Sequence, residues 1–284
     1  MSMPFFASRL LLAATALAVL PAHAESFIRR LLDKPVPGGV AVVPLGDAPT
    51  APVVTYRDRR TMVLREDAGE WIAVVGIPLD AQPGIQQISV QGEGGSRALD
   101  FQVRDKTYAA QHIKLKNKRQ VNPDPADLAR IEKEMAEQVA AYRTFGAHGP
   151  SNVMFDRPVN GGRLSSPFGL RRFFNGEARN PHSGLDFAVP AGTPVRAPAA
   201  GKVILVGDYF FNGKTVFLDH GQGLISMFCH LSAIDVQPGQ EVARGGAVGR
   251  VGATGRATGP HLHWNVSLND VRVDPAIFIG AFKP

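Results

Sequence analysis

Cysteine is almost absent from this 284-residue sequence, and long apolar runs are absent after the first 24 residues. The one cysteine, Cys229, cannot close an internal disulfide, so the hydrophobic core must hold the chain together. Cys229 lies within the apolar run 225–231, where a lone cysteine acts as a small buried hydrophobe rather than a nucleophile. The lack of a second long apolar run predicts no membrane span once the N-terminal segment is removed.

Charge of one sign is not concentrated anywhere in the chain. The 31 Lys and Arg residues exceed the 25 Asp and Glu residues by a formal +6, a surplus that favours anionic partners in general. No dense basic cluster is present to follow a phosphate backbone, so we expect no nucleic-acid partner. A composition of 44% hydrophobic and 20% charged residues also excludes a largely disordered chain.

The first 24 residues have the three parts of a secretory signal. Arg9 supplies the positive start, the apolar run 10–20 follows, and small residues stand at Ala22 and Ala24. We therefore expect cleavage near Ala24, removal of segment 1–24 and export to the periplasm. An uncleaved N-terminal anchor is the alternative, because Arg9 is the segment's one positive residue.

Turn-forming residues are abundant. The 30 glycines and 22 prolines make up about 18% of the chain, against an average of roughly 12%, which predicts a mainly β protein. Residues 25–115 contain short apolar segments separated by turns, as in a small antiparallel β-sandwich or barrel. After the signal segment this region has a single histidine, His112, and no carboxylate pair, so we expect a regulatory or positioning domain.

Residues 116–160 are predicted to form a helical linker. Asp124 is placed to cap a helix and Pro125 to occupy its first turn, and the helix is expected to end near Phe145-Gly146. Five apolar residues fall on one helical stripe: Leu128, Ile131, Met135, Val139 and Tyr142. We interpret this helix as a connector that packs on one or both domains, with a coiled-coil dimer arm as the alternative.

Residues 161–284 return to strands and glycine-rich turns, which predicts a compact all-β domain. Five of the eight histidines lie between positions 182 and 263, three of them in the motifs His182-Ser-Gly-Leu-Asp186 and His261-Leu-His263. Residues two apart in a strand point to the same side, so both histidines of the second motif can serve one site. Imidazole and carboxylate are zinc ligands, and three of them leave a coordination position open for catalysis.

Each motif alone occurs often by chance, and a lone His-x-His can equally be two solvent-facing imidazoles. Their occurrence in one β domain, with His230 inside an apolar strand, favours a metal site. If His263 binds metal with His182 and Asp186, then His261 is an unligated acid or base and His230 its counterpart. His220 is assigned to a turn or a supporting hydrogen bond, and His148 to no role.

The C-terminal region, from about residue 161 to 279, resembles the M23 metallopeptidase family of LytM-type, lysostaphin-like peptidoglycan endopeptidases. The resemblance implies one zinc ion per chain held by His182, Asp186 and His263, with His230 and His261 acting on water and stabilising the developing oxyanion. Small departures from the family pattern remove no ligand. The matching segments are Ser165-Ser-Pro-Phe-Gly169, His182-Ser-Gly-Leu-Asp186, Phe228-Cys-His230 and Gly255-Arg-Ala-Thr-Gly-Pro-His261-Leu-His263.

The resemblance implies a zinc-dependent endopeptidase that acts on the peptide stems of peptidoglycan, with the D-Ala to diaminopimelate cross-link as the expected bond. Cleavage of glycine-rich bridges or proteins is the enzymatic alternative, and a non-hydrolytic peptidoglycan-binding module or amidase activator is the other. In some relatives a preceding segment covers the groove, so we also hypothesise that removing the N-terminal domain raises the rate. The sequence identifies no protein partner.

Overall fold

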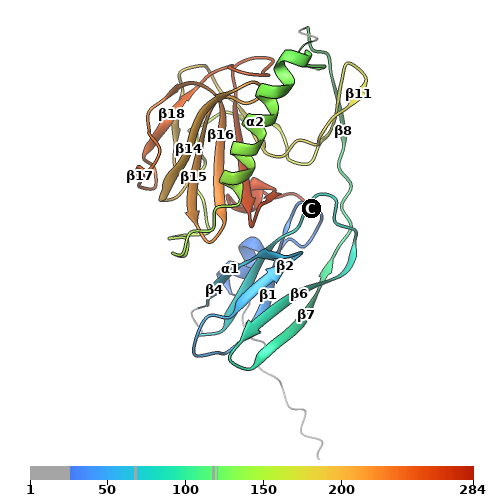
Figure 1. The fold of residues 1–284 in the computed structure, drawn as a ribbon, viewed down its shortest axis with the longest axis vertical. Coiled ribbons are helices and arrows are strands. Elements are labelled where there is room, and N and C mark those ends of the chain that lie inside the picture. The colour runs from blue at the N-terminus through green and yellow to red at the C-terminus, as the bar shows by residue number, and fades with distance from the viewer. Residues whose placement is uncertain (1–25, 67–68, 117–118, 120) are drawn as a thin grey trace, which may run out of the picture.

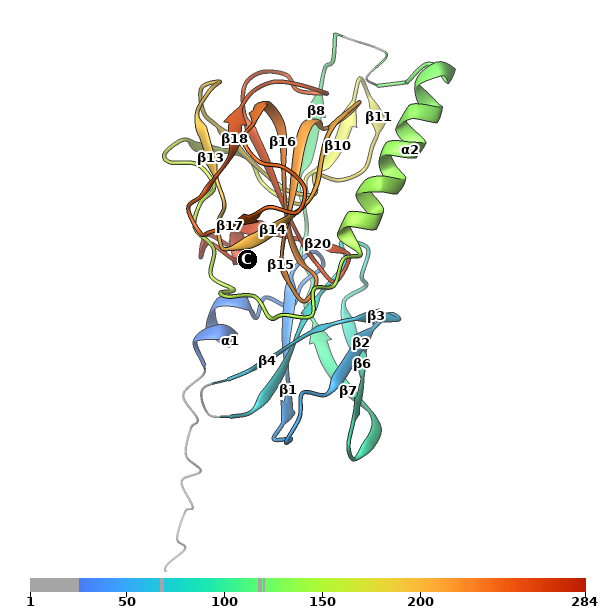
Figure 2. The same ribbon diagram turned by 60° about the vertical axis from the view of Figure 1, so that its left-hand side comes forward.

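The computed structural model describes residues 26–66, 69–116, 119 and 121–284, so the expected signal segment lies outside the described residues. The protein is mainly β, as predicted, with a smaller N-terminal unit at one end and a larger C-terminal unit at the other (Figure 1). The long helix α2 (Pro125–Tyr142) runs along the side of the larger unit (Figure 2). Among the described helices, none combines the length and apolar character needed to cross a membrane.

The N-terminal unit consists of helix α1 (Phe27–Leu32) and two antiparallel sheets. The first sheet has the order β1 (Val40–Gly46), β5 (Trp71–Gly76) and β4 (Met62–Arg65). The second has the order β3 (Arg59–Arg60), β2 (Val53–Tyr56), β6 (Gly84–Gly92) and β7 (Gly95–Val103). Side chains from both sheets form one buried cluster, which confirms the small β-sandwich-like unit.

Strand β5 is buried on both faces. Ala73 and Val75 join the core of the N-terminal unit, whereas Ile72 and Val74 belong to the main core of the C-terminal unit. Alternate residues of a strand point to opposite sides, so one central strand contributes to two cores. The two units therefore share apolar packing instead of being joined by a linker alone.

Helix α2 differs from its sequence prediction in three respects. Asp124 occupies the N-cap position, but its side chain makes no capping hydrogen bond and pairs instead with Arg119 at 3.3 Å. The helix ends at Tyr142, before the expected Phe145-Gly146. Ile131 and Tyr142 are buried as predicted, but Leu128 and Met135 are exposed, because the helix packs on the C-terminal unit over part of its stripe alone.

The C-terminal unit is built on a ten-stranded antiparallel sheet, which confirms the all-β expectation. Its main path has the order β17 (Glu241–Val242), β14 (Gly201–Tyr209), β15 (Gly213–Gly221), β16 (Leu224–Ile234), β19 (Leu262–Leu268), β12 (Leu185–Ala188) and β9 (Arg163–Ser166). Three further strands lie off this path. Strand β18 (Ala247–Val251) pairs with β13 (Pro194–Arg196) and with β16. Strand β20 (Val271–Val273) pairs with β19 and is followed by the short helix η2 (Pro275–Ile277).

A third small sheet connects the N-terminal segment to the C-terminal unit. Strand β8 (Ala110–Ile113) pairs in parallel with β10 (Arg171–Phe174), and β10 pairs with β11 (Glu177–Ala178). The sequence pattern assigns residues 110–113 to the N-terminal β domain, whereas in the structure their backbone pairs with β10 of the C-terminal unit. Four residues carry too little pattern to show which sheet they join.

Candidate metal centre

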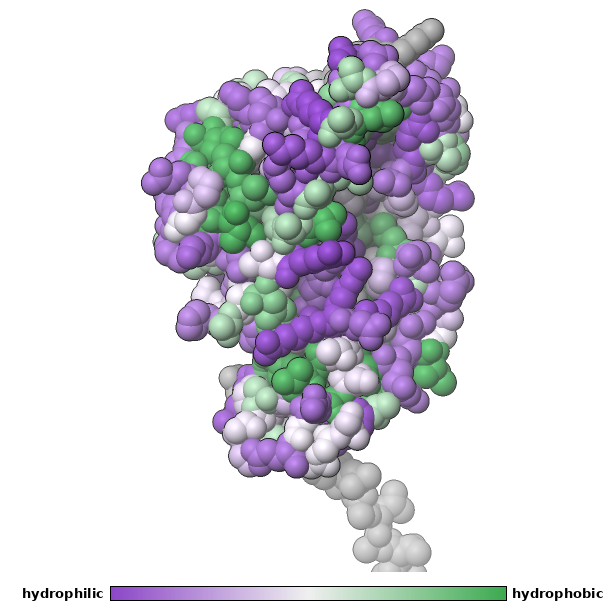
Figure 3. All heavy atoms as spheres, viewed as in Figure 1, coloured by the Kyte–Doolittle hydropathy of each residue, from purple (hydrophilic) through white to green (hydrophobic). Residues whose placement is uncertain are grey.

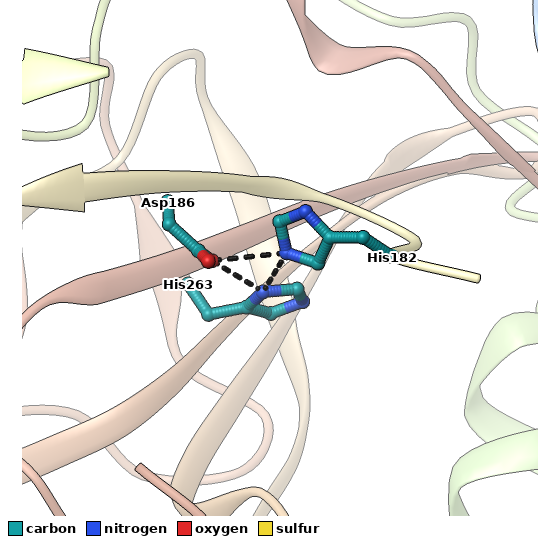
Figure 4. Close-up of side chains that lie close together, drawn as sticks. All are labelled: His182, Asp186 and His263. Atoms are coloured by element: carbon teal, nitrogen blue, oxygen red, sulfur yellow. Dashed lines mark hydrogen bonds and ion pairs between the residues drawn. The ribbon is translucent and has the colours of Figure 1, made fainter. Parts of the chain in front are cut away.

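Three side chains converge at the meeting point of two central strands. Asp186 of β12 lies directly opposite His263 of β19 in the antiparallel pair, and His182 stands four residues before Asp186. The Asp186 Oδ1 atom lies 3.0 Å from His182 Nε2 and 2.9 Å from His263 Nδ1, and the two nitrogens are 3.0 Å apart (Figure 4). This buried group of two imidazoles and one carboxylate can hold a metal ion.

The surroundings orient the three ligands. His182 Nδ1 lies 2.7 Å from the Pro167 carbonyl oxygen, so a proton on Nδ1 is donated outward and the Nε2 lone pair faces the centre. Arg172 Nη2 donates to Asp186 Oδ2 at 3.2 Å, which leaves Oδ1 toward the histidines. These two contacts leave one nitrogen of His182 and one oxygen of Asp186 facing the centre, which suits a divalent cation.

The pKa values favour the metal-binding protonation states. Burial alone raises the pKa of Asp186, but its contacts with His182 and His263 outweigh burial and hold the pKa well below its usual range. Burial lowers the pKa of His263 to about 4. The carboxylate is therefore ionised and the His263 imidazole neutral at neutral pH, as a metal requires of its ligands.

His230 and His261 lie beside this centre. The centres of their rings are 4.8 Å apart, and the centre of the His230 ring lies 6.0 Å from that of the His263 ring. His230 Nδ1 is 2.8 Å from the Thr254 carbonyl oxygen, and His261 Nδ1 is 2.8 Å from that of Gly259. These carbonyls fix both rings and leave each Nε2 for other partners.

A backbone irregularity directs His230 toward the site. Phe228 and Leu231 both face the main core although they are three residues apart, and His230 between them has φ of +60°. In the pairing of β15 with β16, the three residue steps from Phe228 to Leu231 lie opposite the two from Val216 to Lys214, which is a β-bulge. A regular strand would direct His230 into the core on the side of Phe228. Cys229 is fully buried, as the sequence predicted.

Two hollows, of about 310 Å³ and 260 Å³, meet at the metal centre. Strand β8 lines the first through Gln111 and Ile113, and helix α2 lines the second through Glu134 and Met135. Five residues line both: Arg172, Phe174, His230, Arg256 and His263. The hollows thus form one groove that crosses the centre. Figure 3 shows hydrophilic side chains over much of one face of the protein, with hydrophobic patches on both units.

The structure brings together all five residues that the sequence predicts for the site, His182, Asp186, His230, His261 and His263, and adds two arginines that the sequence does not predict. Arg172 belongs to β10, and Arg256 lies in the glycine-rich stretch before His261. Arg172 lies in no motif that the sequence predicts to be functional, and Arg256 lies between Gly255 and His261 in a family-like segment that assigns it no role. The two other histidines discussed above lie elsewhere: His220 is buried at the end of β15, and His148 is exposed.

The fold and the site define a mainly β protein with a buried His–Asp–His metal centre in an open groove. Residues 180–275 match the model of peptidase family M23, and residues 33–106 match that of the peptidase family M23 N-terminal domain. A crystal structure from Pseudomonas aeruginosa, described as a peptidase M23, is 61% identical, with a TM-score of 0.79; the alignment covers 90% of this chain and 100% of that one. The chain therefore belongs to peptidase family M23.

Two curated relatives are similar over the C-terminal unit. The DD-carboxypeptidase/endopeptidase Mpg of Neisseria meningitidis is 42% identical over 113 residues, which are 40% of this chain and 26% of that protein. The peptidoglycan DD-endopeptidase ShyA of Vibrio cholerae is 43% identical over 105 residues, 37% of this chain and 24% of that protein. The chain thus spans about a quarter of the length of the curated relatives it matches.

Proposed function

We propose that this protein is a zinc-dependent endopeptidase that hydrolyses peptide cross-links of peptidoglycan, at the bond between D-Ala and diaminopimelate. The observation that carries the proposal is the buried group His182, Asp186 and His263 at the centre of an open groove. Membership of family M23 and similarity to proteins named for peptidoglycan DD-endopeptidase activity support it. A purely binding or activating module would have no need of the complete ligand set.

His182, Asp186 and His263 would hold one zinc ion per chain. Bound there, zinc supplies Lewis-acid polarisation of the scissile carbonyl and lowers the pKa of water. His230 and His261, each fixed through Nδ1, would use Nε2 to accept or return a proton and to stabilise the developing oxyanion. Burial, followed by the charges of His263 and His261, lowers the pKa of His230 to about 3, so its ring is neutral and able to accept a proton.

The proposal includes the location and organisation of the chain. Segment 1–24 would be a signal cleaved near Ala24, and the mature protein would act in the periplasm, where its substrate lies. Residues 25–115 would form a regulatory or positioning domain, residues 116–160 a helical linker, and residues 161–284 the peptidase domain. The position of β8 along one wall of the groove supports a positioning role for the N-terminal part.

Incubation of residues 25–284 with defined cross-linked muropeptides, read by mass spectrometry, tests this function. We expect dimers to become monomers in the presence of zinc, and the reaction to stop with a chelator or with His263→Ala. His148→Ala is the matched control, because it removes an exposed histidine outside the groove and should leave the rate unchanged. Dimers that stay intact with the zinc-loaded protein would contradict the proposal and favour a binding or activating module.

A further inference from the structure

Arg256 occupies the centre of the groove in a fixed position. Its side chain lines both hollows, and its guanidinium carbon lies 4.8 Å from the ring centre of Phe174 and 4.3 Å from that of Phe211. Contacts of this kind between a guanidinium and an aromatic ring are attractive, so the two rings hold the Arg256 side chain in place. The Arg256 backbone N–H donates to the Phe211 carbonyl at 2.8 Å, so backbone and side chain are both attached to the turn between β14 and β15.

The preceding glycine makes this attachment tight. Gly255 has φ of +69°, and a Cβ at this position would lie 2.3 Å from the Gly213 nitrogen and 2.6 Å from the Phe211 oxygen. A side chain is excluded by both the conformation and the contact. The loop that carries Arg256 is thus pressed against the β14–β15 turn, and the guanidinium is preorganised before any ligand binds.

The charges along the groove favour an anionic ligand. Its described lining holds two arginines, Arg172 and Arg256, and two carboxylates, Asp186 and Glu134. These charges cancel, so a divalent cation at the centre leaves a positive surplus. Burial, with repulsion from Arg172 and Arg179, lowers the pKa of Arg256 to about 10, which still leaves it protonated at neutral pH. The lining carboxylates have their own partners, since Asp186 pairs with Arg172 and Glu134 with Arg130.

We propose that Arg256 is a specificity-determining residue that binds the free carboxylate next to the scissile amide. This inference rests on the proposed function. In a D-Ala to diaminopimelate cross-link, the carbon that bears the scissile nitrogen also bears a free carboxylate. A terminal D-Ala presents the same group, whereas an internal glycine bridge has another amide there. A planar guanidinium suits a carboxylate because it can donate two parallel hydrogen bonds. Arg256 thus selects diaminopimelate cross-links over glycine bridges.

The test uses two cross-linked dimers that differ at one group: the carboxylate beside the scissile amide is free in one and amidated in the other. We expect the zinc-loaded wild type to show at least a tenfold higher kcat/KM for the free carboxylate. Arg256→Gln should lower kcat/KM for that dimer by about 10- to 100-fold, the range of a charge-assisted hydrogen bond, and leave the amidated dimer nearly unchanged. Arg256→Lys should keep part of the preference.

Arg250→Gln is the matched control, because it removes the same charge from an exposed residue of β18 outside the groove. Equal cleavage of both dimers by the wild type would overturn the inference. An equal loss on both dimers with Arg256→Gln would also overturn it, since that result indicates a structural role. If the wild type cleaves neither dimer, the proposed function fails. Calorimetric binding of the two dimers to the zinc-loaded protein then decides the inference: tighter binding of the free carboxylate supports it, and equal binding overturns it.

Discussion

At the scale of single residues, the histidines of the site divide between two proposed tasks, metal binding and proton transfer. His182, Asp186 and His263 present lone pairs to one point at mutual distances of about 3 Å. His230 and His261 lie beside that point, with one ring nitrogen of each directed to a backbone carbonyl. His182 has the same kind of carbonyl contact through Nδ1, so these contacts set which nitrogen is available, whereas the distance of that nitrogen from Asp186 separates the proposed ligands from the proposed proton-transfer residues.

His230→Ala tests this separation. The variant retains His182, Asp186 and His263, so we expect its zinc content to match that of the wild type. The loss of a positioned proton acceptor should lower kcat by about 10²- to 10⁴-fold. Elemental analysis and muropeptide kinetics on the same sample measure both quantities. A variant that loses zinc together with activity, or one that keeps full activity, would show that His230 does not have the proposed role.

At the scale of elements, a buried histidine joins the end of β15 to its neighbours. His220 Nδ1 lies 2.8 Å from the Ala200 carbonyl oxygen, and its Nε2 lies 2.9 Å from Ser226 Oγ on β16. The residue is 5% exposed, and burial lowers its pKa to about 4. The supporting hydrogen bond suggested by the sequence is therefore part of a link between a loop and two strands.

This histidine makes stability depend on pH. Its pKa is about 4 in the folded chain and about 6.5 when unfolded, so between these values the unfolded chain binds the additional proton. The free energy of unfolding should therefore fall as the pH drops from 6.5 toward 4, by up to about 3 kcal/mol from His220. Urea unfolding at pH 7 and pH 4.5 measures this loss. His220→Gln should show a smaller loss than the wild type, and an identical loss in both proteins would disprove the assignment.

At the scale of the whole molecule, the two units are joined through a close backbone approach. A Cβ added to Gly76, at the end of β5, would lie 2.6 Å from the Leu268 carbonyl oxygen of the C-terminal unit. Ile72 and Val74 of the same strand are fully buried in the core of that unit. The N-terminal unit is thus part of the packing that supports β19, the strand that carries His263.

Gly76→Ala should push the two units apart. We expect a loss of about 1–3 kcal/mol in the free energy of unfolding, the usual cost of an added methyl group in a packed core. Gly94→Ala is the matched control, because among the described residues nothing beyond the two chain neighbours lies within 4 Å of a Cβ there, and its effect should stay within about 0.5 kcal/mol. Equal stabilities of the two variants in urea unfolding would contradict the shared core.

The shared core also bears on the hypothesis that removal of the N-terminal domain raises the rate, which stays a prediction. A chain beginning near Gly161 would lack the side chains of β1, β4 and β5 that cover the C-terminal core. It would also lack β8, which lines the groove through Gln111 and Ile113. Removing the domain therefore changes both the support and the wall of the site.

The sequence by itself determined the mainly β fold, the buried cysteine and the candidate ligands, because these depend on local pattern. The alternation of strands, the turn residues and the spacing of His182, Asp186, His261 and His263 are all readable along the chain. The family resemblance rested on those same short motifs. The match to family M23 confirms it.

Only the tertiary structure decided the remaining features, because each depends on contacts between distant segments. The side chain of Met135 follows the helical pattern but lines a hollow and is exposed, although Ile131 and Tyr142 on the same stripe are buried. Strand β8 joins β10 across about 60 residues of chain, and the β-bulge at His230 is set by the pairing of β16 with β15. Arg256 acquires its position from Phe174 and Phe211, which lie far from it in sequence. Local periodicity determines elements, but packing decides what those elements surround.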